Sequence, residues 1–250
     1  MTSTGMEGPA CCAFTPRSSI SALTRPNSLF LSAAAQNNHE TLAPLYQWFS
    51  QRLWIVDDGT RGYFERYAVE SCRDEAYRAA LFSLLQAADL GISNIEFREE
   101  ELTPEIQHAM QTASDPSMAE ALRNFFQLPR VRFWHTAGGA AGAVPLPFEQ
   151  ESRGTRTLFS LLGIIMWCLG NGGTLLVDEL DQSLHSELAR HLVSMFNRPE
   201  QNPRGAQLLF NTHDTNLLDS ELLRRDQVWF TEKSHDGATR VFPLTDFHAR

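Results

Sequence analysis

The sequence predicts an α/β fold, a partial parallel sheet flanked by helices, and the evidence lies in the last hundred residues. Apolar strand-like runs alternate there with segments of helical period. The expected strands are 174–177, 207–210 and 227–230, and the expected helices are 155–169, 183–196 and 215–223. Strands that alternate with helices imply right-handed crossovers and a sheet covered on both faces. The pair Asp236-Gly237 predicts a hairpin turn after the last strand.

The preceding part of the chain predicts shorter elements. Residues 1–23 are rich in Ser, Thr, Gly and Pro and predict a poorly ordered leader. The expected strands are 28–34, 54–56, 92–98 and 131–135, and the expected helices are 41–53 and 77–88. Residues 103–116 are polar and predict a mobile excursion, and the Gly/Ala/Pro run 138–147 predicts a loop.

Composition and charge favour a soluble globular protein and argue against several other classes. The 250 residues are 42% hydrophobic and 20% charged, which suits one large soluble domain. The net charge of -9 argues against a surface that holds nucleic acid by phosphate neutralisation alone. A local basic patch is compatible with this net charge, so direct nucleic-acid binding stays open. No apolar run reaches the ~20 residues that span a bilayer, so no membrane association is expected. The four cysteines form no C-x-x-C motif and no secretion signal is present, so we expect a cytoplasmic protein.

Two carboxylates follow the first strand of the core. The apolar run 174–177 ends at once in Asp178 and Glu179. Ligands bind at the carboxyl edge of an open parallel sheet. One carboxylate there can hold Mg²⁺ through water, and its neighbour can orient a water for attack on a γ-phosphate. A plainer interpretation is an acidic strand end that caps the next helix, as Asp181 or Ser183 would do alone.

Two further segments place polar residues where phosphate could bind. His213 follows strand 207–210, and its imidazole can hydrogen-bond a γ-phosphate or the attacking water. An ordinary histidine at the sheet edge is the alternative. Ser152 and Gly154 open the apolar helix, where free N–H groups and the helix dipole favour anions. A simple Ser or Thr N-cap explains the same residues.

Taken in this order, the segments resemble the second half of an ATPase of the ATP-binding-cassette (ABC) type, a P-loop NTPase-like fold. Residues 152–155 are similar to its signature motif, 175–179 to Walker B, 181–185 to the D-loop region and His213 to the switch histidine. Four pieces more closely resemble the AAA15-like ATPases, a prokaryotic family linked to abortive infection and phage resistance (phage defence) and related to the OLD-type proteins. These pieces are 24–30, 36–39, 178–185 and 211–215. The resemblance covers roughly residues 24–247.

The resemblance implies catalytic roles for Glu179 and His213, a metal-binding role for Asp178, and a nucleotide-binding and metal-binding role for Gln36. Asp178 would be the Walker B acid associated with Mg²⁺, and Glu179 would be the general base that activates the attacking water. His213 would sense the γ-phosphate of ATP. Gln36 would occupy the Q-loop position and reach both the metal and the water, an assignment that depends only on its place before the helical lobe.

The resemblance also implies a homodimer, because this class holds two ATP molecules between two heads. Ser152, Gly154 and Thr155 would then contact nucleotide held by a second protomer. The residues expected in the D-loop are Asp181, Ser183 and His185. Arg153 stands where transporters have Gly, and His185 stands where their D-loop ends in Asp, which weakens a transporter interpretation. The resemblance leaves open a nuclease or effector subunit as a further partner.

The same resemblance divides the chain into four parts. These are a leader (1–23), a strand and Q-loop with the start of a helical lobe (24–60), a mostly helical lobe (61–147) and an ATPase core half (148–250).

A Walker A motif is missing from this pattern. The motif G-x-x-x-x-G-K-[ST] needs a lysine that neutralises phosphate charge, and the only lysine in the chain is Lys233, without a glycine frame. In the AAA15-like family this motif lies N-terminal to every matched piece. We therefore expect an N-terminally truncated copy that alone binds ATP weakly or not at all and has weak or no activity.

Three functions remain open at this stage. The first is a Mg-dependent ATP hydrolase module that uses a Walker A from elsewhere. The second is a non-catalytic remnant that keeps a dimerisation or interaction role. The third takes residues 178–181 as the DExD box of a helicase fragment, although Asn211-Thr212-His213 stands where helicases have a Ser-Ala-Thr element.

Overall fold

A computed structural model describes residues 20–88, 90–98, 104, 108, 112, 129–136 and 142–247. The chain forms two compact units, Met1–Leu53 and Trp54–Arg250. The expected excursion at 103–116 lies outside the described residues except for three isolated positions. No helix among the described residues is both long enough and apolar enough to cross a membrane.

The described part of the first unit is helical. Its helices are α1 (Ile20–Leu23), α2 (Phe30–Gln36) and α3 (Leu42–Arg52). The expected helix at 41–53 is confirmed, whereas the expected strand at 28–34 is wrong. Alanine has the highest helix propensity, and Ala33 and Ala34 are buried on α2. Asn37 then ends the helix by donating its side-chain N–H to the Ala33 carbonyl at 2.8 Å.

A three-stranded parallel sheet forms the centre of the second unit. Its strands are β1 (Leu53–Val56), β5 (Thr174–Val177) and β6 (Gln207–Phe210), in the order β1-β5-β6. β5 and β6 pair in parallel with Leu175 opposite Leu208, at the bounds that the sequence predicts. The α/β fold class, a partial parallel sheet flanked by helices, is thereby confirmed.

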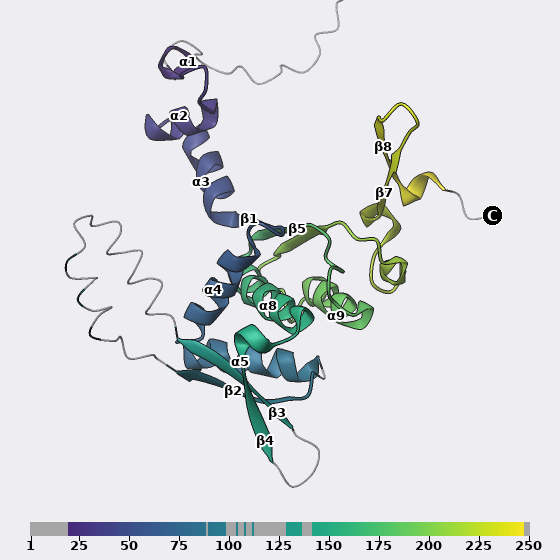
Figure 1. Ribbon diagram of the computed structural model, residues 1–250. Helices are drawn as coiled ribbons and strands as arrows, with labels where there is room; N and C mark the ends of the chain where they lie inside the picture. The colour runs from purple at the N-terminus through teal and green to yellow at the C-terminus, as the bar shows by residue number, and fades with distance from the viewer. Residues whose placement is uncertain are drawn as a thin grey trace, which may run out of the picture. The chain divides into compact units, whose positions relative to one another are not determined.

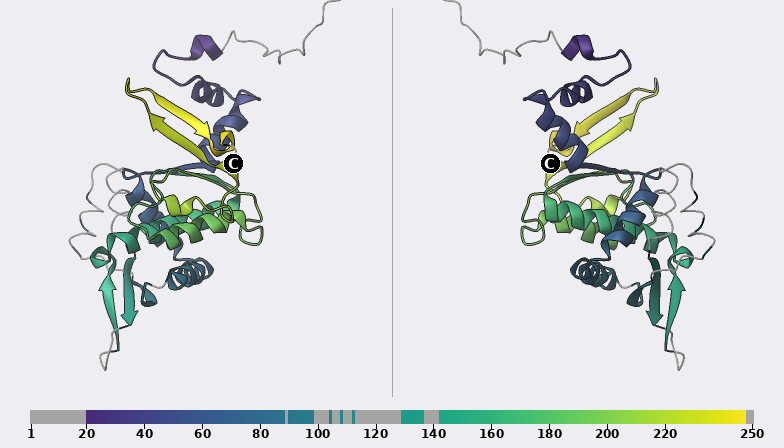
Figure 2. Two further views of the ribbon diagram at one scale, coloured as in Figure 1. Left: turned by 90° about the vertical axis from the view of Figure 1, so that its right-hand side faces the viewer. Right: turned by 90° about the vertical axis from the view of Figure 1, so that its left-hand side faces the viewer.

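Helices α8 (Arg153–Asn171) and α9 (Ser186–Asn197) lie against one face of this sheet (Figure 2). On the opposite face Ile55 is 52% exposed and Leu209 is 54% exposed. The expectation that helices cover both faces is therefore not met among the described residues of this unit. The crossover from β5 to β6 supplies only α9, which lies on the same face as α8.

Two more helices extend the layer around α8. They are α4 (Arg61–Ser71) and α5 (Glu75–Ala87), and Figure 1 shows α4 beside α8. The two helices approach closely because α8 carries Gly163, where a Cβ atom would lie 2.6 Å from the Cβ of Ala68. The hydroxyl of Tyr77 on α5 donates to the Gly163 carbonyl at 3.0 Å. α5 begins at Glu75 with Asp74 as its N-cap, and this supports the helix expected at 77–88.

A second, antiparallel sheet packs at the start of α8. Its strands are β2 (Ile92–Arg98), β3 (Arg130–Thr136) and β4 (Ala143–Pro147) in sequential order. The rings of Phe133, Phe148 and Phe159 join it to α8, with centroids 5.2 to 5.8 Å apart. The strands expected at 92–98 and 131–135 are confirmed. Residues 143–147 are a strand rather than a loop, since an edge strand tolerates proline.

The C-terminal part departs most from expectation. β7 (Trp229–Lys233) pairs with β8 (Thr239–Pro243) in an antiparallel hairpin, and the turn at Gly237 has a φ of 86°. The turn is confirmed, but β7 does not join the parallel sheet. The expected helix at 215–223 is reduced to a 3₁₀ turn, because the Asp214 and Asp219 side chains accept backbone N–H groups two residues on. The 3₁₀ turns are η1 (Phe148–Gln150), η2 (Thr215–Leu217), η3 (Arg225–Gln227) and η4 (Leu244–Asp246).

Candidate functional site

The carboxyl ends of the three parallel strands bring polar residues together. Asp57 follows β1, Asp178 follows β5 and Asn211 follows β6. The backbone N–H of Asp178 donates to the Val56 carbonyl at 2.9 Å, so the β1 and β5 ends are joined at this point. Hydrogen bonds from the backbone N–H and the hydroxyl of Thr60 lower the pKa of Asp57 below its ordinary value.

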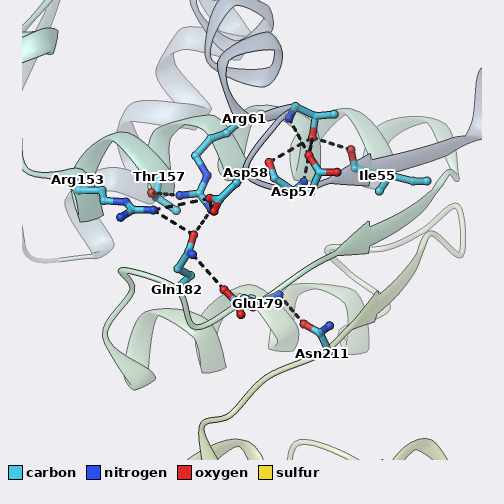
Figure 3. Close-up of polar contacts among 10 residues, drawn as sticks. Ile55, Asp57, Asp58, Arg61, Arg153, Thr157, Glu179, Gln182 and Asn211 are labelled. Atoms are coloured by element: carbon cyan, nitrogen blue, oxygen red, sulfur yellow. Dashed lines mark hydrogen bonds and ion pairs between the residues drawn. The ribbon is translucent and has the colours of Figure 1, made fainter. Parts of the chain in front are cut away.

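Asn211 contacts both expected Walker B carboxylate residues. Its Nδ2 donates to Asp178 Oδ1 at 2.6 Å, and its Oδ1 accepts the backbone N–H of Glu179. Figure 3 shows the contact with Glu179. The Asn211 carbonyl also accepts the backbone N–H of Leu180 at 3.1 Å. One side chain directly after β6 therefore contacts two consecutive residues after β5.

The backbone of Glu179 is in the left-handed region, with a φ of 52°. A residue other than glycine has a free-energy cost there, and such strain is found mainly at functional sites. The hydrogen bond to Asn211 holds this conformation, and it leaves the Glu179 carboxylate exposed. Glu179 Oε2 accepts a hydrogen bond from Gln182 Nε2 at 3.0 Å.

Gln182 connects Glu179 to two arginines. Its Oε1 accepts from Arg61 Nη2 at 2.7 Å and from Arg153 Nη2 at 3.4 Å (Figure 3). Arg61 also donates to the Thr157 hydroxyl at 3.3 Å. The start of α4, the start of α8 and the turn after β5 are thus joined through polar side chains.

A second contact joins the strand ends near His213. Asp181 Oδ1 accepts the Thr212 hydroxyl at 2.6 Å and the His213 backbone N–H at 3.3 Å. The His213 residue is exposed, at the same sheet edge as Glu179. The structure therefore brings Asp178, Glu179, Asp181 and His213 to one edge.

The residues expected in the signature motif form the N-terminus of α8. Ser152 is the N-cap, and its Oγ accepts the Thr155 backbone N–H at 3.0 Å. Gly154 lies against the turn after β5, where a Cβ atom would be 2.7 Å from the Ser183 carbonyl oxygen. The plain N-cap interpretation thus describes Ser152, and the signature and D-loop segments touch within one chain.

The remaining expected residues have simpler surroundings. Ser183 has a left-handed φ of 64°. His185 is the N-cap of α9. Gln36 ends α2 in the first unit, so its Q-loop assignment stays a prediction.

A histidine–glutamate pair fixes the chain just before Ser152. His135 Nε2 on β3 lies 2.6 Å from Glu151 Oε1, and the Glu151 side chain is 3% exposed. A buried carboxylate needs such a partner. The antiparallel sheet therefore anchors the segment that leads into the N-cap of α8.

Sequence reasoning missed Arg61, Gln182 and the His135–Glu151 pair, and assigned no role to Asn211. A signal existed for Asp57 and Asp58, which follow the expected strand 54–56 as Asp178 follows strand 174–177. Because parallel strands end at one edge, these residues could have been placed beside the Walker B pair. No local motif points to Arg61, since its contact with Gln182 spans 121 positions of the sequence.

The donor set suits a magnesium ion that is held mainly by its substrate. Among the described residues, no three His, Cys, Asp or Glu side chains gather as a metal site. Mg²⁺ in phosphate-transfer sites is held by one or two carboxylates together with waters and phosphate oxygens. The exposed carboxylate of Asp178, oriented by Asn211, fits that requirement.

A known family matches most of this chain. Its description is "AAA domain, putative AbiEii toxin, Type IV TA system", and the match covers residues 13–219. No curated protein matches. The matched range contains the parallel sheet, α8, α9 and the polar strand ends described above. The chain therefore belongs to this family of ATPase-like AAA domains.

Proposed function

We propose that this chain is a Mg-dependent ATP hydrolase module of the ABC type, similar to the AAA15-like and OLD-related ATPases. The observation that carries the proposal is the double contact of Asn211 with Asp178 and Glu179. It holds the carboxylate of Asp178 and the backbone of Glu179 at the edge where α/β sheets bind ligands. The AAA family match supports the coarse assignment to nucleotide chemistry.

Each strand-end residue has a distinct proposed task. Glu179 accepts the proton of the water that attacks the γ-phosphate in line, and Gln182 fixes one of its oxygens. Asp178 would hold Mg²⁺, which neutralises charge on the phosphates when it is bound. His213 would hydrogen-bond the γ-phosphate from the adjacent strand end.

A second copy of the chain would complete the site. Ser152, Gly154 and Thr155 would face nucleotide held by that copy, in a homodimer that sandwiches ATP. Within one chain, the turn from Asp181 to His185 lies against Gly154, since a Cβ atom there would be 2.7 Å from the Ser183 carbonyl oxygen. A nuclease or effector subunit and a role in phage defence are part of the same proposal.

The phosphate-binding lysine must come from outside these 250 residues. Lys233 is the only lysine in the chain, and it lies on β7 of the C-terminal hairpin. Without a P-loop, most backbone contacts to the phosphates are missing. We therefore expect no micromolar binding of ATP by the isolated chain, and calorimetry with MgATP checks this expectation.

Phosphate release tests the proposed function. The protein is purified from its native host with its copurifying partners, as wild type and as the variants D178N, E179Q and E187Q. Loss of the general base lowers turnover by about a hundredfold or more. E187Q, an exposed carboxylate on α9, serves as the control and retains the wild-type rate. Equal rates for E179Q and E187Q would contradict the proposal.

A further inference from the structure

One carboxylate is shared by two guanidinium groups beside the candidate base. Asp58 Oδ1 lies 3.4 Å from Arg61 Nη2 and 3.7 Å from Arg153 Nη2 (Figure 3). The Asp58 side chain is 69% exposed. Among the described residues, no other carboxylate forms an ion pair with either arginine. The cluster of Asp58, Arg61 and Arg153 therefore carries an excess positive charge.

Among the described residues, Glu179 forms no ion pair with Arg61 or Arg153. The Gln182 side chain lies between the two arginines and Glu179. Its carbonyl oxygen accepts from both guanidinium groups, and its amide nitrogen donates to Glu179. The positive cluster and the candidate base are thus adjacent but separate. An anion bound to the two arginines would lie next to Glu179 without contacting its carboxylate.

The two arginines differ in how firmly they are held. The Arg61 side chain is 20% exposed, and it donates to both Gln182 and Thr157. The Arg153 side chain is 61% exposed and has longer contacts. Guanidinium groups bind phosphate oxygens through paired N–H donors. A group held by several contacts at one side and a more exposed group at the other suit an anion that enters from solvent.

We propose that Arg61 and Arg153 bind the terminal phosphate group of a polyphosphate. When no phosphate is bound, the Asp58 carboxylate occupies the position of that phosphate. The inference deepens the proposed function, because it supplies cationic groups beside the base in a chain that lacks a suitable lysine. The bound phosphate displaces the Asp58 carboxylate, which swings into solvent. Binding through two side chains without a P-loop is weak, in the millimolar range.

Titration with pyrophosphate and with ATP, both without metal, tests this site on the full chain. Heteronuclear NMR signals of the arginine Nε–Hε groups report the contact. The variant R61Q weakens pyrophosphate binding about tenfold or more, since it removes a held, charged donor. The variant R153Q weakens it about two- to fivefold, because Arg153 is more exposed.

The variant D58N gives the most direct test, because the proposal predicts a higher affinity for pyrophosphate. It removes the competing carboxylate, so pyrophosphate binding tightens about two- to fivefold. R224Q and D226N are the matched controls, since Arg224 and Asp226 form an exposed ion pair at 3.0 Å near the C-terminal hairpin. They leave the affinity unchanged. D58N keeps the arginine contacts to Gln182 and Thr157, so it remains informative if R61Q folds poorly.

The outcomes separate the two proposals. Equal affinity of pyrophosphate and ATP assigns the contact to phosphate alone, and tighter ATP binding adds a contact to the nucleoside. Both support the site. Unchanged affinity in R61Q and R153Q relative to R224Q, or weaker binding by D58N, overturns it. Those results leave the hydrolysis test with E179Q unaffected, so this inference can fail while the proposed function stands.

Discussion

The side chain of Asn211, at the end of β6, accepts the backbone N–H of Glu179, at the end of β5. The same side chain donates to the carboxylate of Asp178. The variant N211A removes both contacts. Water can replace them because these residues are exposed, so the free energy of unfolding falls by less than about 1 kcal/mol. Phosphate release falls about a hundredfold, since the carboxylate of Asp178 and the backbone of Glu179 lose their fixed orientation.

The control for this variant is N216A, another exposed asparagine with side-chain hydrogen bonds. It retains the wild-type rate of phosphate release. Thermal unfolding and phosphate release are measured on the same samples. A large loss of stability in N211A with an unchanged rate would contradict an orienting role for Asn211.

Gly154 is required by the close approach of the Ser183 carbonyl. A Cβ atom at this position would lie 2.7 Å from that oxygen, so G154A pushes the turn after β5 away from α8. Overpacking of this kind costs about 1–3 kcal/mol of the free energy of unfolding. Chemical denaturation measures it. The variant G62A is the control, because nothing lies within 4 Å of a Cβ there. If G154A is as stable as G62A, the close approach between the start of α8 and the turn after β5 is contradicted.

Gly163 sets the distance between α4 and α8. The variant G163A places a methyl group 2.6 Å from the Ala68 Cβ, and we expect it to destabilise the second unit by about 1–3 kcal/mol. G170A lies on the same helix with nothing within 4 Å of its Cβ. That control is expected to stabilise the helix by about 0.5–1 kcal/mol. Melting temperatures that shift in the same direction for both variants would argue against this packing.

The buried thiols resist modification in the folded chain. Burial raises the pKa of Cys72 and of Cys168 to about 12, from an ordinary 9.0. At pH 8 only about one thiol in ten thousand is then ionised, so iodoacetamide reacts very slowly at these two positions. Mass spectrometry of digests, with and without denaturant, measures the labelling. Rapid labelling of both residues without denaturant would contradict the packing around α8.

The raised pKa values of the two thiols also make the free energy of unfolding depend on pH. The unfolded thiols lose their protons first as the pH rises through about 9, whereas the folded thiols keep theirs until about 12. Their contribution therefore lowers the free energy of unfolding as the pH rises within that window. Denaturation midpoints at pH 8, 9 and 10 follow this decline.

The sequence predicts well those helices and strands that are determined by residues within the element or directly beside it. β5 and β6 are apolar runs that end in polar clusters, and the helix at 155–169 is a long apolar segment with a Ser N-cap. The strand expected at 28–34 failed because three alanines at 33–35 outweigh the strand-like residues before them. β7 was placed in the wrong sheet, because pairing partners depend on tertiary structure rather than on the strand itself.

In the candidate site, too, residues with a local sequence signal could be predicted and long-range contacts could not. Asp178 and Glu179 could be found from sequence, because a carboxylate pair directly after a buried strand is a local signal. The contacts of Asn211 with this pair span 32 and 33 positions. The pairing of Arg61 with Gln182 spans 121. Such contacts follow from the order of strands in the sheet, which one sequence does not specify.

The nucleotide bound to the purified protein tests the central claim most directly. Wild type and E179Q are recovered from the native host with their copurifying partners, given MgATP, freed of unbound nucleotide and denatured, and the released nucleotide is identified. If Glu179 is the general base, E179Q retains unhydrolysed ATP while wild type yields ADP and phosphate. ADP from both proteins at the same rate would show that the carboxylate at the end of β5 is not the base.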